Sequence, residues 1–228
     1  MASKKSIIAI TVITASALVM LGSHYSKEKQ MKPLVAMGGQ IELLAPEAVP
    51  EPEYRYIRGN STQLSYIADM KVPLTLPNGV FLSNVRGFDG FYPLQGQMEV
   101  EGRSISDIFI VDESKQLHGV AVNQLFLDKT GMKIDDRFSM NGRNYELRGV
   151  IKSLPDDSGK QMNEEPLLML RDYAERGNGM WEIATKRGLR YRMISKRLAP
   201  RQLQLDFSMR FPKSTTVIKL ADAEKQAP

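Results

Sequence analysis

Apolar and polar residues alternate over several short stretches of the chain, a pattern typical of strands that bury one face. The alternation is clear in 80–85 and in 189–193, and in 203–211 five apolar residues recur at every second position. We therefore predict strands over these three ranges. In the second of them, the alternation places Arg190 and Arg192 on the solvent face of the strand.

Residues 119–151 carry the strongest turn and cap signals. Asn123 follows a short apolar run and is a preferred N-cap residue, and Gly131 can end the following helix in a left-handed conformation. Asn141 and Gly142 supply the positive φ values that a tight hairpin turn requires. We predict a strand, a helix and a β-hairpin in succession, over 119–122, 124–129, and 137–140 paired with 144–151.

Prolines and polar residues decide the character of the remaining segments. A short strand is predicted over 37–44, followed by an exposed connector over 45–53, which carries three prolines and three glutamates. Residues 154–165 are almost without apolar side chains and predict a mobile loop. Pro166 suits the first turn of a helix, which we expect to end at Gly177. Strands with two short helices, joined mostly by short turns, indicate an α+β fold with mostly antiparallel pairing.

The N-terminus contains an uninterrupted apolar run. Ser6 to Ser26 include no Asp, Glu, Lys or Arg, and a helix of this length spans roughly 30 Å, the thickness of a bilayer core. We predict a single transmembrane helix, which divides the chain into an anchor (1–30), a folded domain (31–215) and a polar C-terminal tail (216–228). A cleaved signal peptide is the alternative, because Ala15-Ser16-Ala17 has the form of a cleavage site.

The composition excludes several kinds of chemistry. The 228 residues include no Cys, so disulfides, thiolate nucleophiles and Cys-ligated metal centres are absent. His118 is the single histidine outside the segment next to the predicted anchor, which leaves no pair of histidines for a metal site in the folded part. No phosphate-binding, dinucleotide-binding or serine-nucleophile motif is present. We therefore predict a protein that is not an enzyme and that binds no cofactor or metal.

Basic residues gather toward the C-terminal part of the chain. From Lys186 to Lys213 there are nine basic residues and one acidic residue, a net charge of 9 − 1 = +8. Such a segment attracts anionic headgroups or an acidic protein patch. We predict that the partner or the membrane surface is contacted by Arg190, Arg192, Lys196, Arg197 and Arg201. The alternative is a solvated face balanced by acidic segments elsewhere, and the small net charge of the folded part predicts no nucleic-acid partner.

An aromatic loop precedes the middle of the chain. Phe88, Phe91 and Tyr92 lie close together in the sequence GFDGFYPLQG, among glycines and a proline. They form a possible contact loop. The alternative is that they cap the edge of a hydrophobic core.

The run GVAVNQLFLDKTGMKIDDRFSMNGRNYELRGVI, residues 119–151, resembles the extracytoplasmic domain of FtsX-like ABC-transporter permeases, the MacB, LolC/LolE and YbbP group. The similarity extends more weakly to GFDGFYPLQGQMEVEG, PLLMLRDYAERG and GLRYRMI, and it covers roughly residues 35–200. Asp135 stands where the family usually has a glycine. These permeases continue into further membrane helices, whereas no apolar run of 18 or more residues follows residue 26 here.

The resemblance implies a fold and a role. We expect a single-pass inner-membrane protein with its folded domain in the periplasm, either a stand-alone relative or part of a split permease. It would act as a non-enzymatic subunit or adaptor in envelope transport of a lipid, lipoprotein or related substrate, through contact with protein partners. The alternative function is a structural or binding component of a secretion or cell-envelope assembly unrelated to ABC transport.

Overall fold

The computed structural model describes residues 38–46, 49–156, 160–171, 186–195 and 198–221. The predicted membrane anchor lies outside these ranges. Within them, no helix is both long enough and apolar enough to cross a membrane.

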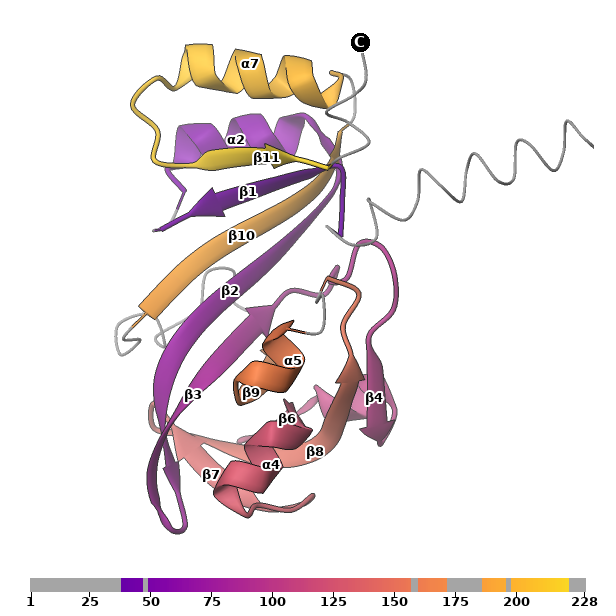
Figure 1. Cartoon of the computed structure of the whole chain (residues 1–228), viewed down its shortest axis with the longest axis vertical. Helices are drawn as coiled ribbons and strands as arrows, with labels where there is room; N and C mark the ends of the chain where they lie inside the picture. The colour runs from indigo at the N-terminus through magenta and orange to yellow at the C-terminus, as the bar shows by residue number, and fades with distance from the viewer. Residues whose placement is uncertain (1–37, 47–48, 157–159, 172–185, 196–197, 222–228) are drawn as a thin grey trace, which may run out of the picture.

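The molecule is a mixed α/β domain with one large sheet and few helices (Figure 1). In the described residues the sheet has 11 strands, and its main path runs β11 (Val217–Leu220), β1 (Ile41–Ala45), β10 (Lys186–Ser195), β2 (Ser61–Leu76), β3 (Gly79–Phe88), β9 (Leu167–Arg171), β6 (Leu117–Asn123), β8 (Arg143–Ser153) and β4 (Glu99–Gly102). β5 (Val111–Asp112) pairs with β6, and β7 (Arg137–Met140) pairs with β2 and β8. The β3–β9 and β6–β8 pairs are parallel, and the other described pairs are antiparallel.

The helices cover different parts of the sheet. α2 (Glu51–Gly59) and α7 (Pro200–Arg210) lie side by side over the β11–β1 end, whereas α4 (Gln124–Thr130) and α5 (Lys160–Glu164) lie at the other end (Figure 1). A short helix, α3 (Ile105–Ile108), packs near β6. The long strand β2 runs between the two ends and connects them through its pairing with β10, β3 and β7.

Hydrophobic side chains are buried on both faces of the sheet. On β2, Tyr66 and Ala68 belong to a large core that also contains Phe207 of α7, whereas Ile67 belongs to a smaller core with Phe88. Because alternate residues of a strand point to opposite faces, these two cores lie on opposite sides of the sheet. Leu64–Ala68 of β2 and Leu167–Leu170 of β9 are therefore buried continuously, whereas burial alternates over the second half of β2.

The predictions for residues 119–151 are confirmed. The Asn123 side chain accepts a hydrogen bond from Phe126 N at the start of α4, and Gly131 ends the helix with φ 71°. Asn141 and Gly142 have φ values of 49° and 70° and connect β7 to β8. Asp135 has φ 72°, so it adopts the left-handed conformation that its glycine-like position requires.

The predicted strand over 203–211 is wrong, because Pro200 to Arg210 form helix α7. Leu203 and Phe207 are buried, whereas Leu205 and Met209 are 58% and 69% exposed. When apolar residues occupy every second position, those four apart share one face of a helix, and all of them share one face of a strand. The pattern is therefore compatible with both structures. Pro200 in the first turn favours the helix, since its fixed φ and missing N–H are tolerated there.

The predicted helix that starts at Pro166 is also wrong over its first residues, because Leu167–Arg171 form strand β9. This strand lies between β3 and β6, and Leu167 to Leu170 are all buried. A run of four apolar residues is compatible with a buried strand or with a helix, and the pairing with two neighbouring strands decides between them. The remainder of the predicted helix falls on 172–185, outside the described residues.

Three other expectations are corrected. Residues 51–53 of the predicted connector begin helix α2, whose first turn accommodates Pro52. The predicted loop over 154–165 contains helix α5. The predicted polar tail includes strand β11, which pairs with β1 and extends the sheet. The strands predicted at 80–85 and 189–193 are confirmed as parts of β3 and β10.

Candidate functional site

Three arginines and three carboxylates gather on one face of the sheet, and we call this group the arginine cluster. Its members are Glu42 of β1, Asp69 of β2, Arg86 of β3, Arg190 and Arg192 of β10, and Asp156 from the loop after β8. The strand register creates part of it, because Asp69 lies directly opposite Arg86 and Glu42 directly opposite Arg192. Cross-strand neighbours of opposite charge stabilise a sheet.

Asp156 is the shared partner of the three arginines. Its Oδ2 lies 2.7 Å from Arg192 Nη1, 3.5 Å from Arg86 Nη1 and 4.0 Å from Arg190 Nη1. Arg86 Nε also donates to Asp69 Oδ1 at 2.8 Å, and Arg190 Nη2 contacts the same carboxylate through Oδ2. Glu42 Oε1 lies 3.7 Å from both Arg190 and Arg192. The cluster therefore has a formal net charge of 3 − 3 = 0.

Burial makes the pairing in this cluster obligatory. The side chains of Asp156, Arg86 and Arg192 are 0%, 2% and 4% exposed. Burial alone raises the pKa of Asp156, but Arg86 and then Arg192 outweigh it and lower that pKa to about 2. Burial likewise opposes ionisation of Asp69, and Arg86 and Arg190 together lower its pKa. Both acids are therefore ionised at neutral pH, and each compensates a buried guanidinium.

The arginine cluster is connected to the aromatic loop through Tyr92. The Tyr92 hydroxyl donates to Asp156 Oδ1 at 2.5 Å, and burial together with the Asp156 charge raises the pKa of Tyr92. Phe88 and Tyr92 are 4% and 7% exposed and pack in the smaller core. Phe91 is 66% exposed. Two of the three predicted contact residues therefore cap the edge of a core, and Phe91 is the one that faces solvent.

A surface pocket of about 410 Å³ lies beside this loop. Its apolar lining comes from Phe88, Tyr92, Pro93, Met98 and Ile105, and its polar lining includes Asp89, Gln97 and Arg171. The sequence predicts contact by the aromatic loop but does not indicate Met98, Ile105 or Arg171, because they lie on other segments. We call this cavity the aromatic pocket.

Asn123 connects four segments at the other end of the sheet. It is completely buried, and its Oδ1 accepts hydrogen bonds from Phe126 N at 3.1 Å and Leu167 N at 2.9 Å. Its Nδ2 donates to Met162 O at 3.0 Å and Glu165 O at 2.8 Å. One amide thus satisfies four backbone groups, which belong to α4, α5, β9 and Glu165 between the last two. The N-cap role is predictable from sequence, whereas the contacts with α5 and β9 are not.

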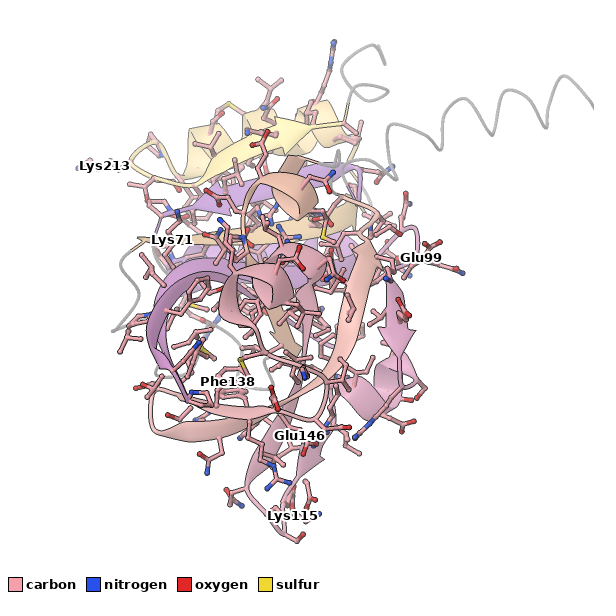
Figure 2. All side chains as sticks on the ribbon, turned by 60° about the horizontal axis from the view of Figure 1, so that its bottom comes forward. Lys71, Glu99, Lys115, Phe138, Glu146 and Lys213 are labelled. Carbon is pink, nitrogen blue, oxygen red and sulfur yellow. The ribbon has the colours of Figure 1, made fainter. Side chains whose placement is uncertain are left out.

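A second ionic group lies around Glu146 of β8. Arg148 Nε donates to Glu146 Oε2 at 2.8 Å, and Arg137 Nη2 lies 3.2 Å from Oε1. Burial raises the pKa of Glu146, but hydrogen bonds from Arg148 and Arg137 outweigh it and lower the value. Glu146 lies toward the Lys115 end of the molecule, away from Lys213 after α7 (Figure 2). His118 is half-buried, its ring packs against Tyr145, and burial lowers its pKa, which fits a structural residue.

The predicted contact residues lie in different environments. Arg192 is buried and Arg190 is largely covered, with 18% of its side chain exposed, so their predicted position on a solvent face is wrong. Both arginines can be buried because other strands and a loop contribute carboxylates that pair with them. Arg201 is exposed on α7. Lys196 and Arg197 lie outside the described residues.

The outer face of α7 combines apolar and basic side chains. Leu205 and Met209 are exposed, and so are two basic residues, Arg201 in the first turn of α7 and Lys213 in the turn that follows the helix. We call these four residues the α7 outer face. Arg210 is exposed as well, but it forms an ion pair with Asp206 at 2.9 Å.

The described residues contain two groups of paired charges. They contain no group of three or more His, Asp or Glu side chains placed to hold a metal ion. The charges of the arginine cluster and of the Glu146 group are paired with one another, and pairing lowers the pKa of Asp69, Glu146 and Asp156. The described residues therefore form a body in which ion pairs link several strands, with a surface pocket and an exposed helical face.

Sequence reasoning missed the acids that neutralise the buried arginines. A weak signal exists for Asp69, since it interrupts an otherwise apolar part of β2, and a charge in a buried strand implies a partner. Asp156 carries no such signal, because it stands among the turn-forming and charged residues of the segment 154–165.

Comparisons with known proteins identify the class of fold. The chain has the fold of the periplasmic region of MacB from Actinobacillus actinomycetemcomitans, with a TM-score of 0.51 and 13% identity over 87% of this chain and 96% of that one. Other similar structures are the extracellular domain of the noncanonic ABC-type transporter YknZ from Gram-positive bacteria (TM-score 0.49, 11% identity, 78% and 98% covered) and a domain of a putative permease from Porphyromonas gingivalis (TM-score 0.46, 11% identity, 80% and 88% covered).

At the level of sequence, no family model matches the chain. No curated protein matches it either. The structural similarity to the periplasmic region of MacB nevertheless confirms, at the level of the fold, the predicted resemblance to the extracytoplasmic domain of ABC-transporter permeases.

Proposed function

We propose that this chain is a non-enzymatic, membrane-anchored extracytoplasmic subunit or adaptor that acts by contact in a transport assembly of the ABC-permease type. The observation that carries the proposal is that the two ends of the described domain lie next to each other. β1 pairs with β11, and Ala221 N donates to Gln40 O at 3.0 Å. The chain enters and leaves the domain at one point, which suits a body held on a stalk.

The membrane part of the proposal rests on the apolar run before this point. Residues 6–26 have the length and composition of one membrane helix, and 14 residues connect Ser26 to Ile41 at the start of β1. We propose an anchor over 1–30 that places the domain on the periplasmic side of the inner membrane. The fold shared with the periplasmic region of MacB supports this orientation.

The ion pairs that link separate segments support a role in contact rather than in chemistry. The arginine cluster joins four strands, the loop after β8 and the aromatic loop, so these segments hold one another in place. We propose that the α7 outer face is a contact surface of the domain. It includes Arg201, one of the five basic residues that the sequence predicts to contact a partner or the membrane surface. The transported substrate class would be a lipid, a lipoprotein or a related envelope molecule.

The absence of native cysteine allows a direct test of orientation in cells. Ser114→Cys places one thiol in the exposed turn between β5 and β6, and Ser3→Cys places one before the apolar run. We expect a membrane-impermeant maleimide to label the full chain at position 114 but not at position 3. The reverse pattern would overturn the proposed orientation, and mass spectrometry of the purified chain shows whether the segment is cleaved.

Purification of the full chain from its native membrane in mild detergent tests the transport role. We expect a multi-span permease or an ATPase to copurify in a fixed ratio. A ring or scaffold assembly without either would instead support a structural component of the cell envelope and would refute the ABC-type role.

A further inference from the structure

We propose that the aromatic pocket binds a small carboxylate with an apolar body. This inference is independent of the transport role, because it rests on the pocket alone. The cavity of about 410 Å³ has a size typical of sites for small ligands, which are mostly apolar with a few polar groups that orient the ligand. The lining here follows that pattern.

The apolar walls of the pocket are held in place by the smaller core. Phe88, Tyr92 and Met98 are each less than a tenth exposed, so most of each side chain is packed and a limited surface faces the cavity. The Phe88 ring packs edge-on against Phe109, with centroids 4.9 Å apart, and Tyr92 is fixed through its hydrogen bond to Asp156. Ile105 at the rim is 46% exposed. Preformed apolar walls of this kind favour a flat or branched apolar group.

Asp89 is the carboxylate in the lining, and both of its oxygens accept hydrogen bonds from the protein. Asp89 Oδ1 accepts hydrogen bonds from Ser65 Oγ and Phe91 N, both at 3.0 Å, and Oδ2 accepts one from Tyr66 N at 2.9 Å. Three donors therefore surround this charge and tie it to β2 and to the loop backbone. Its role is to hold the aromatic loop against the sheet.

Arg171 supplies the cation of the pocket. It is the last residue of β9 and is exposed, and its guanidinium lies over Gly90, where an added Cβ would be 2.6 Å from Nη2. A guanidinium has five N–H donors in a planar fork, so it can bind a carboxylate in addition to a partner within the protein. An apolar wall beside the Arg171 guanidinium favours a ligand that has both an apolar group and a carboxylate.

Methionine methyl NMR on the full chain in phosphatidylcholine nanodiscs tests the proposal. Met98 reports on the pocket and Met193, in the other core, reports on the rest of the domain. With 4-phenylbutyrate as probe, we expect a saturable shift of the Met98 methyl resonance, assigned through Met98→Leu, and no shift of Met193. Absence of a saturable Met98 shift would overturn the proposal.

Variants and analogues test the two halves of the recognition. Arg171→Gln should weaken 4-phenylbutyrate binding by about ten-fold, the typical effect of losing a charge-assisted pair, and should leave 4-phenylbutanol unaffected. Gly90→Ala, which displaces the guanidinium, should act in the same direction, whereas Arg143→Gln at an exposed site outside the pocket should change nothing. Equal affinity for the acid and the alcohol, unchanged by Arg171→Gln, would contradict the assignment.

Two sources can supply this chemistry, and a third ligand distinguishes them. If N-acetyl-Leu-Phe, with its free carboxylate, binds more tightly than 4-phenylbutyrate, the proposal holds and the natural ligand is a peptide C-terminus. If 4-phenylbutyrate binds more tightly, the proposal holds and the natural ligand is a free organic acid.

Discussion

Asp156 and Arg192 form the shortest of the three ion pairs that Asp156 makes in the arginine cluster, with Oδ2 and Nη1 2.7 Å apart and neither side chain more than 4% exposed. One residue comes from a loop after β8 and the other from β10, and 35 residues separate them in the chain. The pair connects the loop after β8 to β10, which pairs with β1. Asp156 also accepts a hydrogen bond from Tyr92, so the aromatic loop is connected to the same pair. Removal of either charge leaves the other buried with one partner fewer.

We predict that Asp156→Ala lowers the free energy of unfolding by about 3–5 kcal/mol, the usual cost of breaking a buried ion pair from one side. Chemical denaturation of the full chain in nanodiscs, followed by circular dichroism, measures this change. Glu113→Gln is the control, since Glu113 is an exposed carboxylate and should change stability by less than about 0.5 kcal/mol. Similar losses for the two variants would contradict the role of the buried pair.

Stability should fall in acid because the pKa of Asp156 is lowered to about 2 in the folded state. An unfolded aspartate titrates near pH 3.9, so this stabilisation is present above about pH 5 and is lost as the pH falls toward 2. The loss from Asp156 amounts to roughly 2–3 kcal/mol. The melting temperature of Asp156→Asn should therefore be lower at pH 7 and should depend less on pH between 5 and 2; parallel pH curves for the two proteins would refute this.

Asn123→Ala should be strongly destabilising, because it leaves Phe126 N, Leu167 N and two carbonyl groups without their partner. We expect a loss of about 2–4 kcal/mol in the free energy of unfolding. Asn123→Asp retains both acceptor contacts and loses the two donors, so it should also destabilise the protein. Gln124→Ala, at the exposed next position, is the matched control and should have little effect on the same denaturation curve.

The α7 outer face should respond to an anionic surface. Ser208→Cys, labelled with a polarity-sensitive dye, reports from the exposed side of α7 in a chain without other cysteines. We expect a blue shift of the dye in phosphatidylglycerol nanodiscs relative to phosphatidylcholine, and its loss in Arg201→Gln/Lys213→Gln. A dye at Ser114→Cys, near the Lys115 end, should not respond; an equal response there would exclude a specific role of α7.

Tyr56 should ionise unusually late. Burial and the hydrogen bond that its hydroxyl donates to Asp206 Oδ2 at 2.5 Å raise its pKa to about 12. The neutral form is favoured by folding, so this contribution to stability is present below pH 10 and is lost as the pH rises through 12. In an absorbance titration, Asp206→Asn should shift one late-ionising tyrosine toward pH 10, and a titration curve unchanged by this variant would contradict the contact.

Local signals predicted the parts of this fold whose causes lie within a few residues. Asn123 caps α4, Gly131 ends it, and Asn141-Gly142 forms a hairpin turn, because each depends on the hydrogen bonds or φ values of adjacent residues. The strand predicted over 203–211 is wrong because the alternation there is compatible with both a strand and a helix, and the contacts with other segments decide between them. The resemblance of residues 119–151 to a permease domain was correct for the same local reason, since its motifs are turn glycines and apolar positions.

The sequence by itself thus determined the turns, the caps, the absence of cysteine chemistry and the class of fold. The tertiary structure decided the environment of the charges and the cavity. Arg192 alternates with apolar neighbours as a solvent-facing residue would, yet it is buried because Glu42 and Asp156 arrive beside it from other segments. The free energy of a buried charge depends on partners that are distant in the chain, so periodicity along one strand cannot reveal it.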